Sequence, residues 1–297
     1  MSAIFSATPA IEPLPAQRSR GYWSKVIRRL LGDPVAIAAA AVLFLLLVLA
    51  LAGPWIAPAD PYQTSMLKRL KAIGTPGHLL GTDELGRDML SRLIVGARLS
   101  LFIGITPVLC AFIAGSAIGI VAGYAGGVVN SVIMRTIDVF YAFPSVLLAV
   151  ALSGALGAGV TNSLVSLTIV FIPQIARVAE AVTTQVRGRD YVEAARASGA
   201  NAFAVVRVHV LGNVLGPIFV YSTSLVAVSM ILASGLSFLG LGVKPPEPEW
   251  GLMLNTLRTA IYTQPGVAAL PGLMIFITSL SFNLLSDGLR AAMDNKD

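Results

Sequence analysis

Six long apolar runs alternate with shorter polar stretches along this chain of 297 residues. A helix needs about 20 mainly apolar residues to cross the hydrocarbon core of a bilayer, and each run is close to that length. The pattern therefore predicts an all-α membrane protein with six transmembrane helices. The predicted spans are Val35–Gly53, Leu99–Tyr124, Ile133–Leu156, Leu164–Val182, Ile218–Leu239 and Val267–Leu289. Asp33 and Pro34 precede the first span as a favourable N-cap and first helical residue.

The charged residues outside the apolar runs predict the orientation. The N-terminal segment 1–34 carries five Lys and Arg residues: Arg18, Arg20, Lys25, Arg28 and Arg29. Because Lys and Arg collect in cytoplasmic segments, this one is predicted to be cytoplasmic, and six spans return the tail 291–297 to the same side. The segment Lys68–Arg98 argues against this orientation, because it places six Lys and Arg residues outside. The rule is weaker for a long loop that also carries acids. A cleaved signal peptide is the less favoured alternative, because its apolar region would be only about 7–15 residues long.

Composition supports a multi-pass membrane protein. The chain is 56% hydrophobic and 12% charged, whereas soluble domains carry about 25% charged residues. The net charge of +6 fits cytoplasmic loops better than nucleic-acid binding. Cys110 is the single cysteine and the chain has two histidines, so no internal disulfide, metal site or cysteine-based enzyme is indicated.

Small residues and prolines add detail to the predicted spans. Every fourth residue over Ala111–Gly123 is Ala or Gly, which predicts a smooth face where another helix packs closely. Pro144 is predicted to break the third span and Pro173 the fourth. Broken helices are tolerated in membranes where they line a cavity or pack on protein, so the prolines favour a transport pathway.

A polar stretch, Arg189–Pro217, separates two apolar runs and must project into water. Asp190 and Glu193 predict a capping box, and Gly199 predicts the end of a short helix. Asn201 is placed to cap a second helix.

The second helix of this stretch is predicted to place Phe203, Val206 and Val210 on one face. The spacing also resembles a DNA-binding helix–turn–helix, but the flanking spans argue against that interpretation.

The polar stretch resembles the EAA loop of permease subunits in binding-protein-dependent ABC importers. Glu193-Ala194-Ala195, Gly199 and Leu211 match the motif. Gly212 replaces the usual Pro, and His209 stands at an apolar position where the peptide/nickel branch usually has histidine. Further segments are similar to the C-type permease of that branch, and the likeness covers roughly 25–294: Leu80–Asp88, Ser237–Val243 with Trp250-Gly251, and Asn283–Arg290.

This resemblance implies a type I ABC importer permease fold whose EAA loop, at 187–215, forms a coupling helix. It divides the chain into the cytoplasmic segment 1–34, a first helix with outer loop over 35–98, a five-helix core over 99–290 and the tail. The residues that the resemblance assigns to ATPase coupling are Asp190, Tyr191, Glu193, Ala194, Ala195, Arg196 and Gly199.

The resemblance also implies partners for the chain. These are a second homologous permease, two cytoplasmic ATPase subunits and a solute-binding protein outside. The chain has no Walker A motif, so it is not expected to be an enzyme. ATP and Mg²⁺ are expected to bind the ATPase subunits, and this chain is expected to hold no cofactor or metal.

Thr82–Arg98 is predicted to form an outer amphipathic helix, with Leu85, Met89, Leu93 and Ile94 on its apolar face. Candidate residues for docking the binding protein are Asp83, Glu84, Arg87, Asp88 and Trp250. The three acids of this segment could also bind a metal, but helix-end charges and surface ion pairs are the favoured interpretation.

Two ion pairs are predicted near a cytoplasmic gate, Arg135 with Asp138 and Arg177 with Glu180, because ionisable groups near membrane depth are costly unless they serve a purpose. Candidate residues along the translocation path are Tyr141, Ser229, Ser234 and Asn283.

The predicted function is ATP-driven import of di- or oligopeptides by alternating access. Nickel, glutathione or another solute would use the same architecture. An ion-driven secondary transporter is a lower alternative, because it would not need an ATPase-docking loop. A membrane-embedded enzyme is disfavoured because neither H-E-x-x-H nor G-x-S-x-G occurs in the sequence.

Overall fold

The computed structural model describes residues 22–293, and this part of the chain is built from helices and connecting loops without a β-strand. Two isolated β-bridges lie in the loop before α3, between Thr75 and His78 and between Thr82 and Asp88. In order, the elements are α1 (Tyr22–Leu30), α2 (Pro34–Ile56), η1 (Met66–Lys68), α3 (Met89–Ala125), α4 (Gly127–Tyr141), α5 (Ser145–Leu156), α6 (Val160–Arg187), α7 (Asp190–Ala197), α8 (Ala202–Val205), η2 (Val206–Val210), α9 (Leu211–Phe238), α10 (Trp250–Thr256), η3 (Ala260–Tyr262) and α11 (Pro265–Met293).

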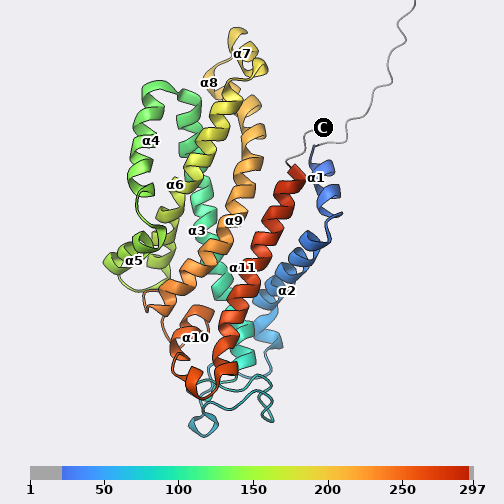
Figure 1. Cartoon of the computed structure of the whole chain (residues 1–297), viewed down its shortest axis with the longest axis vertical. Helices are drawn as coiled ribbons and strands as arrows, with labels where there is room; N and C mark the ends of the chain where they lie inside the picture. The colour runs from blue at the N-terminus through green and yellow to red at the C-terminus, as the bar shows by residue number, and fades with distance from the viewer. Residues whose placement is uncertain (1–21, 294–297) are drawn as a thin grey trace, which may run out of the picture.

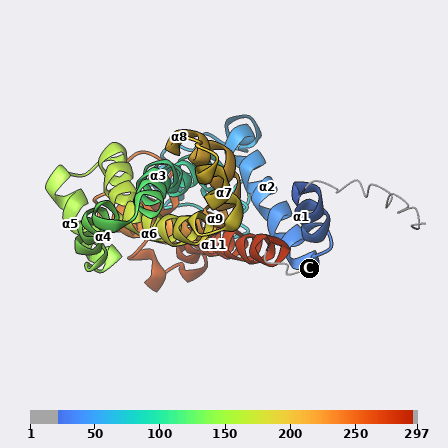
Figure 2. The ribbon, with the colours of Figure 1, turned by 90° about the horizontal axis from the view of Figure 1, so that it is seen from above.

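The long helices lie side by side with their axes roughly along the longest direction of the molecule (Figure 1). Seen from above, α4 and α5 occupy one edge and α1 and α2 the other, with α3, α6 and α9 between them (Figure 2). The short helix α7, the C-terminal end of α11 and α1 share one end of the molecule, and the loop 57–88 lies at the opposite end (Figure 1). We call the loop 57–88 the outer loop, following the predicted orientation.

Five helices of the described chain are long and apolar enough to cross a membrane: α2, α3, α6, α11 and the continuous stretch from α8 to α9. Asp33 caps α2 as predicted, accepting hydrogen bonds from the amides of Val35 and Ala36. Large apolar side chains such as Phe44 and Leu51 point outward from α2, at 68% and 64% exposure. Apolar surface on this scale fits contact with lipid.

The predicted third span is not one straight helix. The chain bends by 84° between α4 and α5, and the pair makes a sixth span only if both parts are counted together. Pro144 precedes the first residue of α5, where proline lacks an amide donor and disfavours helical backbone in the residue before it. The predicted break at Pro144 is therefore confirmed, whereas the break at Pro173 is wrong, because α6 runs through this residue.

Helix α3 is longer than the predicted second span, because it also contains residues 89–98 of the predicted outer amphipathic helix. Thr82–Asp88 is loop, and Asp88 caps α3 by accepting from the Ser91 amide at 2.9 Å. Met89 and Leu93 are buried, but Leu85 is 38% exposed. The prediction of a separate surface helix over Thr82–Arg98 is wrong, because this stretch packs inside the outer end of the protein.

The predicted small-residue face on α3 is confirmed, and it packs against α6. A side chain added at Gly115 would lie 3.0 Å from the Ile175 Cβ, and one at Gly123 would lie 2.8 Å from the Thr183 Cβ. At Gly119 an added Cβ would collide with the Ala176 carbonyl oxygen and approach the Ala179 Cβ to 2.6 Å. Such contact between backbones is available only where one helix presents small residues.

We expect Gly119→Val to lower the stability of the protein by about 1–3 kcal/mol, because the added branched side chain forces α3 and α6 apart. The thermal midpoint of the purified protein in detergent measures this loss. Gly154→Val on α5 is the matched control, since a Cβ there has no neighbour within 4 Å. Equal midpoints for the two variants would contradict the close packing of α3 on α6.

Two groups of buried apolar side chains hold the helices together. One joins α3, α5, α6 and α9, and the partly buried Phe112 packs against it. The Phe112 ring also meets the Phe219 ring of α9 edge to face, with centroids 6.3 Å apart. The other joins α2, α3, α10 and α11 around the fully buried Trp250. Helices α3 and α9 contribute to both groups, so they form the centre of the fold.

Candidate functional site

The loop between α6 and α9 places α7 at the tip of the molecule (Figure 1). Arg189 is the N-cap of α7 and its side chain makes no capping hydrogen bond. Asp190 is the first helical residue, so the predicted capping box of Asp190 and Glu193 is wrong. Both acids lie in the first turn, where negative charge is favourable beside the free amides of a helix N-terminus.

The predicted end of α7 is confirmed. Gly199 has a φ of +82°, a conformation that glycine adopts without steric cost. The Ala200 amide donates to the Ala195 carbonyl at 3.2 Å, which closes the helix end in the usual way. Asn201 then caps α8 as predicted, accepting from the Ala204 amide at 2.8 Å.

Helix α7 has one inward and one outward face. Val192 is fully buried, and Ala195 is partly buried against the same apolar group. Glu193 and Ala194 are exposed, as are Asp190 and Tyr191. Four of the predicted coupling residues therefore share the solvent-facing side of the helix.

The predicted apolar face of the second helix is confirmed for Val206 and Val210, which pack against the same apolar group, and is wrong for Phe203. Phe203 is 75% exposed, whereas Val205 and Val210 are fully buried. The π-helical turn η2 then places one extra residue in the turn between Val206 and Val210. Phe203 lies before this turn in α8, where Val205 takes the buried position instead.

Aromatic contacts connect α7 to the membrane helices. The Arg196 guanidinium carbon lies 4.7 Å from the centre of the Tyr124 ring at the end of α3. The Tyr191 ring lies 6.3 Å from the His209 ring in η2. Tyr124 was not predicted from the sequence, because no local pattern relates the end of α3 to a residue 72 positions later.

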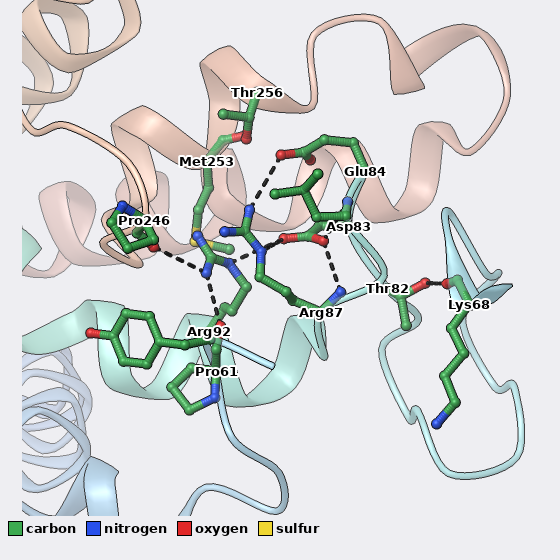
Figure 3. Close-up of polar contacts among 12 residues, drawn as sticks. Pro61, Lys68, Thr82, Asp83, Glu84, Arg87, Arg92, Pro246, Met253 and Thr256 are labelled. Carbon is green, nitrogen blue, oxygen red and sulfur yellow. Dashed lines mark hydrogen bonds and ion pairs between the residues drawn. The ribbon is translucent and has the colours of Figure 1, made fainter. Parts of the chain in front are cut away.

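The outer loop is held by a buried ionic cluster, which we define as Asp83, Glu84, Arg87 and Arg92 (Figure 3). Asp83 Oδ2 accepts from Arg87 Nε at 2.6 Å and lies 3.3 Å from Arg92 Nε. Asp83 Oδ1 accepts from the amides of Leu85 and Arg87, both at 2.9 Å. The Asp83 carboxylate therefore has both the charge partners and the hydrogen bonds that a buried ion requires.

Further contacts extend the cluster across the outer end. Arg92 Nη1 donates to the Pro61 carbonyl at 2.9 Å and to the Pro246 carbonyl at 3.4 Å (Figure 3). Asp88 Oδ1 lies 3.0 Å from His78 Nδ1, and Trp250 Nε1 donates to the Leu93 carbonyl at 3.0 Å. These contacts join three separate segments, which we call the outer cap: the outer loop, the start of α3 and the segment 246–250.

The burial of these residues changes how the predicted docking site is understood. Asp83, Arg87 and Asp88 are 2–4% exposed and Trp250 is fully buried, so their side chains hold the outer end together and do not form its surface. Glu84 is the partial exception, with its side chain 21% exposed. The interpretation of these charges as surface ion pairs is wrong for the same reason. Within residues 22–293, no group of three or more potential metal-ligating side chains gathers.

An open groove of about 820 Å³ lies beside the cluster, and we call it the outer groove. Its polar side chains are Asp60, Tyr62, Arg98 and Glu247, with Phe102 among its apolar ones. Tyr62 Oη donates to Glu247 Oε2 at 3.0 Å. Burial and this hydrogen bond raise the pKa of Tyr62, so the phenol stays protonated at neutral pH.

Glu249 is a buried carboxylate at the N-terminus of α10, 2% exposed. Its oxygens accept from the amides of Gly251 and Leu252, both at 2.8 Å. Burial nevertheless dominates and raises the pKa of Glu249.

We expect the contribution of Glu249 to stability to decrease as pH rises. The folded protein binds the proton more tightly than the unfolded chain, so this stabilisation is complete below the ordinary Glu pKa of about 4.3 and is lost as pH rises through the folded value. Each unit of difference in pKa corresponds to about 1.4 kcal/mol. Thermal midpoints of wild type and Glu249→Gln between pH 4 and pH 8 measure it. A midpoint difference that does not vary with pH would contradict the prediction.

The candidate path residues do not form one site. Ser234 and Asn283 line the same apolar groove of about 520 Å³ between α9 and α11. Tyr141 lines a different pocket, with Gln174. Ser229 is fully buried inside the protein, and its hydroxyl has no hydrogen-bond partner in the described part of the chain.

The predicted ion pairs are wrong in their partners. Arg177 pairs with Asp138 across α6 and α4, and its guanidinium also lies 4.9 Å from the Tyr141 ring centre. Glu180 instead accepts from Asn130 Nδ2 at 2.7 Å. Residues three apart on one helix do face the same side, but here Asp138, Arg177 and Glu180 find partners on the neighbouring helix.

With this architecture in place, comparison with known proteins identifies the family. Residues 115–296 match the family model described as binding-protein-dependent transport system inner membrane component. The chain belongs to this family. It is the permease subunit of an ABC importer, a multi-pass inner membrane protein and not the ATPase. Residues 21–72 of the permease also match the N-terminal transmembrane domain of oligopeptide transport permease C.

Curated relatives resemble the permease over most of its length. It is 41% identical to a glutathione transport system permease protein of Pectobacterium atrosepticum, covering 92% of this chain and 91% of the relative. It is 43% identical to a di/tripeptide transport system permease protein of Pseudomonas aeruginosa, covering 86% of each chain. The matching glutathione permease of Escherichia coli O157:H7 is 39% identical and covers 99% of this chain and 96% of its own.

The fold also matches a solved transporter. A chain of the inward-facing MetNI methionine ABC transporter superposes with a TM-score of 0.56 at 18% identity, covering 69% of this permease and 97% of that chain. The type I ABC importer permease fold predicted for the chain is therefore confirmed.

Proposed function

We propose that this permease imports short peptides across the inner membrane by alternating access. The observation that carries the proposal is the likeness, over 86–99% of the chain, to relatives named for glutathione and for di- and tripeptides. Glutathione is itself a modified tripeptide, so both names describe solutes of one size and chemistry. Each offers a carboxylate, amide groups and a short backbone.

The proposed assembly contains a second, homologous permease, two cytoplasmic ATPase subunits and an external solute-binding protein. The family description, which names dependence on a binding protein, supports the last of these. ATP and Mg²⁺ would bind to the ATPase subunits. The solute would cross between the two permeases as the ATPases close and reopen.

The exposed side of α7 is the proposed contact with the ATPase. Asp190, Tyr191, Glu193 and Ala194 face solvent there, while the buried Val192 fixes the helix to the membrane domain. Small Ala194 allows close approach, and Glu193 offers two acceptor oxygens. A rigid, protruding helix with this pattern suits a groove on a soluble partner.

The outer end of the permease is the proposed contact for the solute-binding protein. The ionic cluster would act here as the internal support of the docking surface, because its charges are buried. The exposed polar groups of the outer groove, including Arg98 and Glu247, would make the contact itself.

The apolar groove between α9 and α11 is the proposed face toward the second permease. Two of the residues predicted for the path, Ser234 and Asn283, line this groove, and most of their neighbours there are apolar. Closing this groove against another helical subunit would bring these two polar groups beside the translocation path.

An uptake assay tests the proposed solute class. The permease is expressed with its partner subunits in cells that lack their own peptide importers, and entry of labelled glutathione, dialanine and trialanine is followed. We expect at least one of the three to accumulate and the others to compete. Uptake of nickel that none of the peptides inhibits would contradict the peptide proposal while leaving the transporter assembly intact.

A further inference from the structure

Helix α7 contacts α3 through a side chain outside the EAA loop. The guanidinium of Arg196 lies over the ring of Tyr124, with its central carbon 4.7 Å from the ring centre. A cation at this distance is attracted by the negative face of the ring. The chain itself connects α7 only to α6 and α8, so this contact is a separate route from α7 to the membrane helices.

Tyr124 is well placed to receive force from α7. It lies in the last turn of α3 and packs against the apolar group that also contains Val192. The carbonyl of the preceding residue, Gly123, accepts from Arg187 Nη1 at the end of α6 at 3.3 Å. The end of α3 is therefore braced against α6 where the Tyr124 ring meets Arg196.

The other end of α3 belongs to the outer cap. Asp88 caps its first turn, Arg92 donates to Pro61 and Pro246, and the Leu93 carbonyl accepts from Trp250. With 37 residues, the helix is about 55 Å long at roughly 1.5 Å per residue, against a hydrocarbon core of about 30 Å. One continuous helix thus joins the tip that carries α7 to the outer groove.

We propose that Tyr124 is a positioning residue through which movement of α7 is transmitted to α3 and thereby to the outer groove. When the ATPase displaces α7, the Arg196 contact moves the end of α3, and the helix carries the displacement to Arg98 and the cap. This inference rests on the proposed ATPase contact of α7 and adds a route by which that contact reaches the outer end.

The cation–ring attraction distinguishes this role from simple space-filling. Tyr124→Phe keeps the ring face, whereas Tyr124→Leu keeps apolar bulk but removes the ring. Arg196→Gln removes the cation at an exposed position, where the fold does not depend on it. An exposed contact of this kind changes an equilibrium by about two- to fivefold.

Labelling of the outer groove measures the transmission without requiring a known solute. In the complete transporter in lipid nanodiscs, Cys110→Ser removes the single native thiol of the permease and Arg98→Cys places one on α3 in the groove. Labelling is read on the permease after the subunits are separated. The rate of reaction with a charged maleimide is compared with and without ATP plus vanadate. Co-purification of the ATPase subunits is measured in parallel.

We expect ATP plus vanadate to change the labelling rate in this background, and Tyr124→Leu to make that change about two- to fivefold smaller while the ATPases stay bound. Tyr124→Phe should behave as the background, and Arg196→Gln should add nothing to Tyr124→Leu. A background rate that does not respond overturns the proposal, as does an unchanged response in Tyr124→Leu. If Tyr124→Leu fails to assemble, Arg196→Gln becomes the test, and an unchanged response in that variant is enough to overturn the proposal. Loss of the ATPases from Glu193→Lys tests the proposed ATPase contact of α7 separately.

Discussion

Glu193→Lys is expected to lower ATP-driven uptake by the assembled transporter at least tenfold while the permease remains in the membrane. Glu193 is exposed on α7, next to the buried Val192 that anchors the helix. Reversing its charge places a cation where the partner ATPase is proposed to donate hydrogen bonds, and a loss of about 1.4 kcal/mol in that contact is already tenfold. Uptake of labelled peptide and the amount of ATPase retained on purification measure the effect.

The control for this variant separates charge from shape. Glu193→Gln keeps the size and one acceptor oxygen, so we expect a smaller loss of uptake. Arg98→Glu reverses an exposed charge at the opposite end of the molecule and should leave ATPase retention unchanged. Uptake by Glu193→Lys at the wild-type rate would remove Glu193 from the ATPase contact.

Asp83→Ala is expected to destabilise the folded protein by about 3–5 kcal/mol, because it leaves two buried guanidinium groups without their shared carboxylate. Asp83 bridges Arg87 and Arg92 and also accepts from two backbone amides of the same loop. The thermal midpoint in detergent and the yield of protein in the membrane measure the loss.

A residue of the same cluster supplies the matched control. The Glu84 side chain is 21% exposed and its Oε1 meets Arg87 Nη2 at 3.3 Å, so Glu84→Gln should cost less than about 1 kcal/mol. Combining Asp83→Ala with Arg87→Met should restore part of the stability, because the double variant buries one fewer unpaired charge. Equal midpoints for Asp83→Ala and Glu84→Gln would show that the cluster is not buried as described.

Features that depend on neighbouring residues were predictable from the sequence. The apolar runs located the membrane helices, and Asp33, Gly199 and Asn201 marked helix ends correctly. The small-residue face of α3 was also predictable, because the small residues recur at every fourth position of a single helix. Each of these features follows from backbone geometry or from the length of a bilayer span.

Features that depend on distant segments were not predictable. The charges of Thr82–Asp88 have the pattern of a surface segment, but Asp83, Arg87 and Asp88 are buried in the folded chain. Their neighbour Arg92 bonds the distant carbonyls of Pro61 and Pro246. Arg177 and Glu180 were assigned to each other, because no local pattern shows that α4 brings Asp138 and Asn130 beside them. Tyr124 was not predictable for the same reason, because its partner Arg196 lies in the distant loop between α6 and α9.

The π-turn η2 has a geometric consequence for the whole transporter. Each residue of an α-helix advances the chain by about 100° around the axis, and a single π-turn accommodates one additional residue within an otherwise continuous helix. The direction in which the side chains of α8 point, relative to those of α9, is therefore set by one residue. Removal of one residue from η2 would turn α8, and the loop that precedes it, by about 100° around the axis of α9.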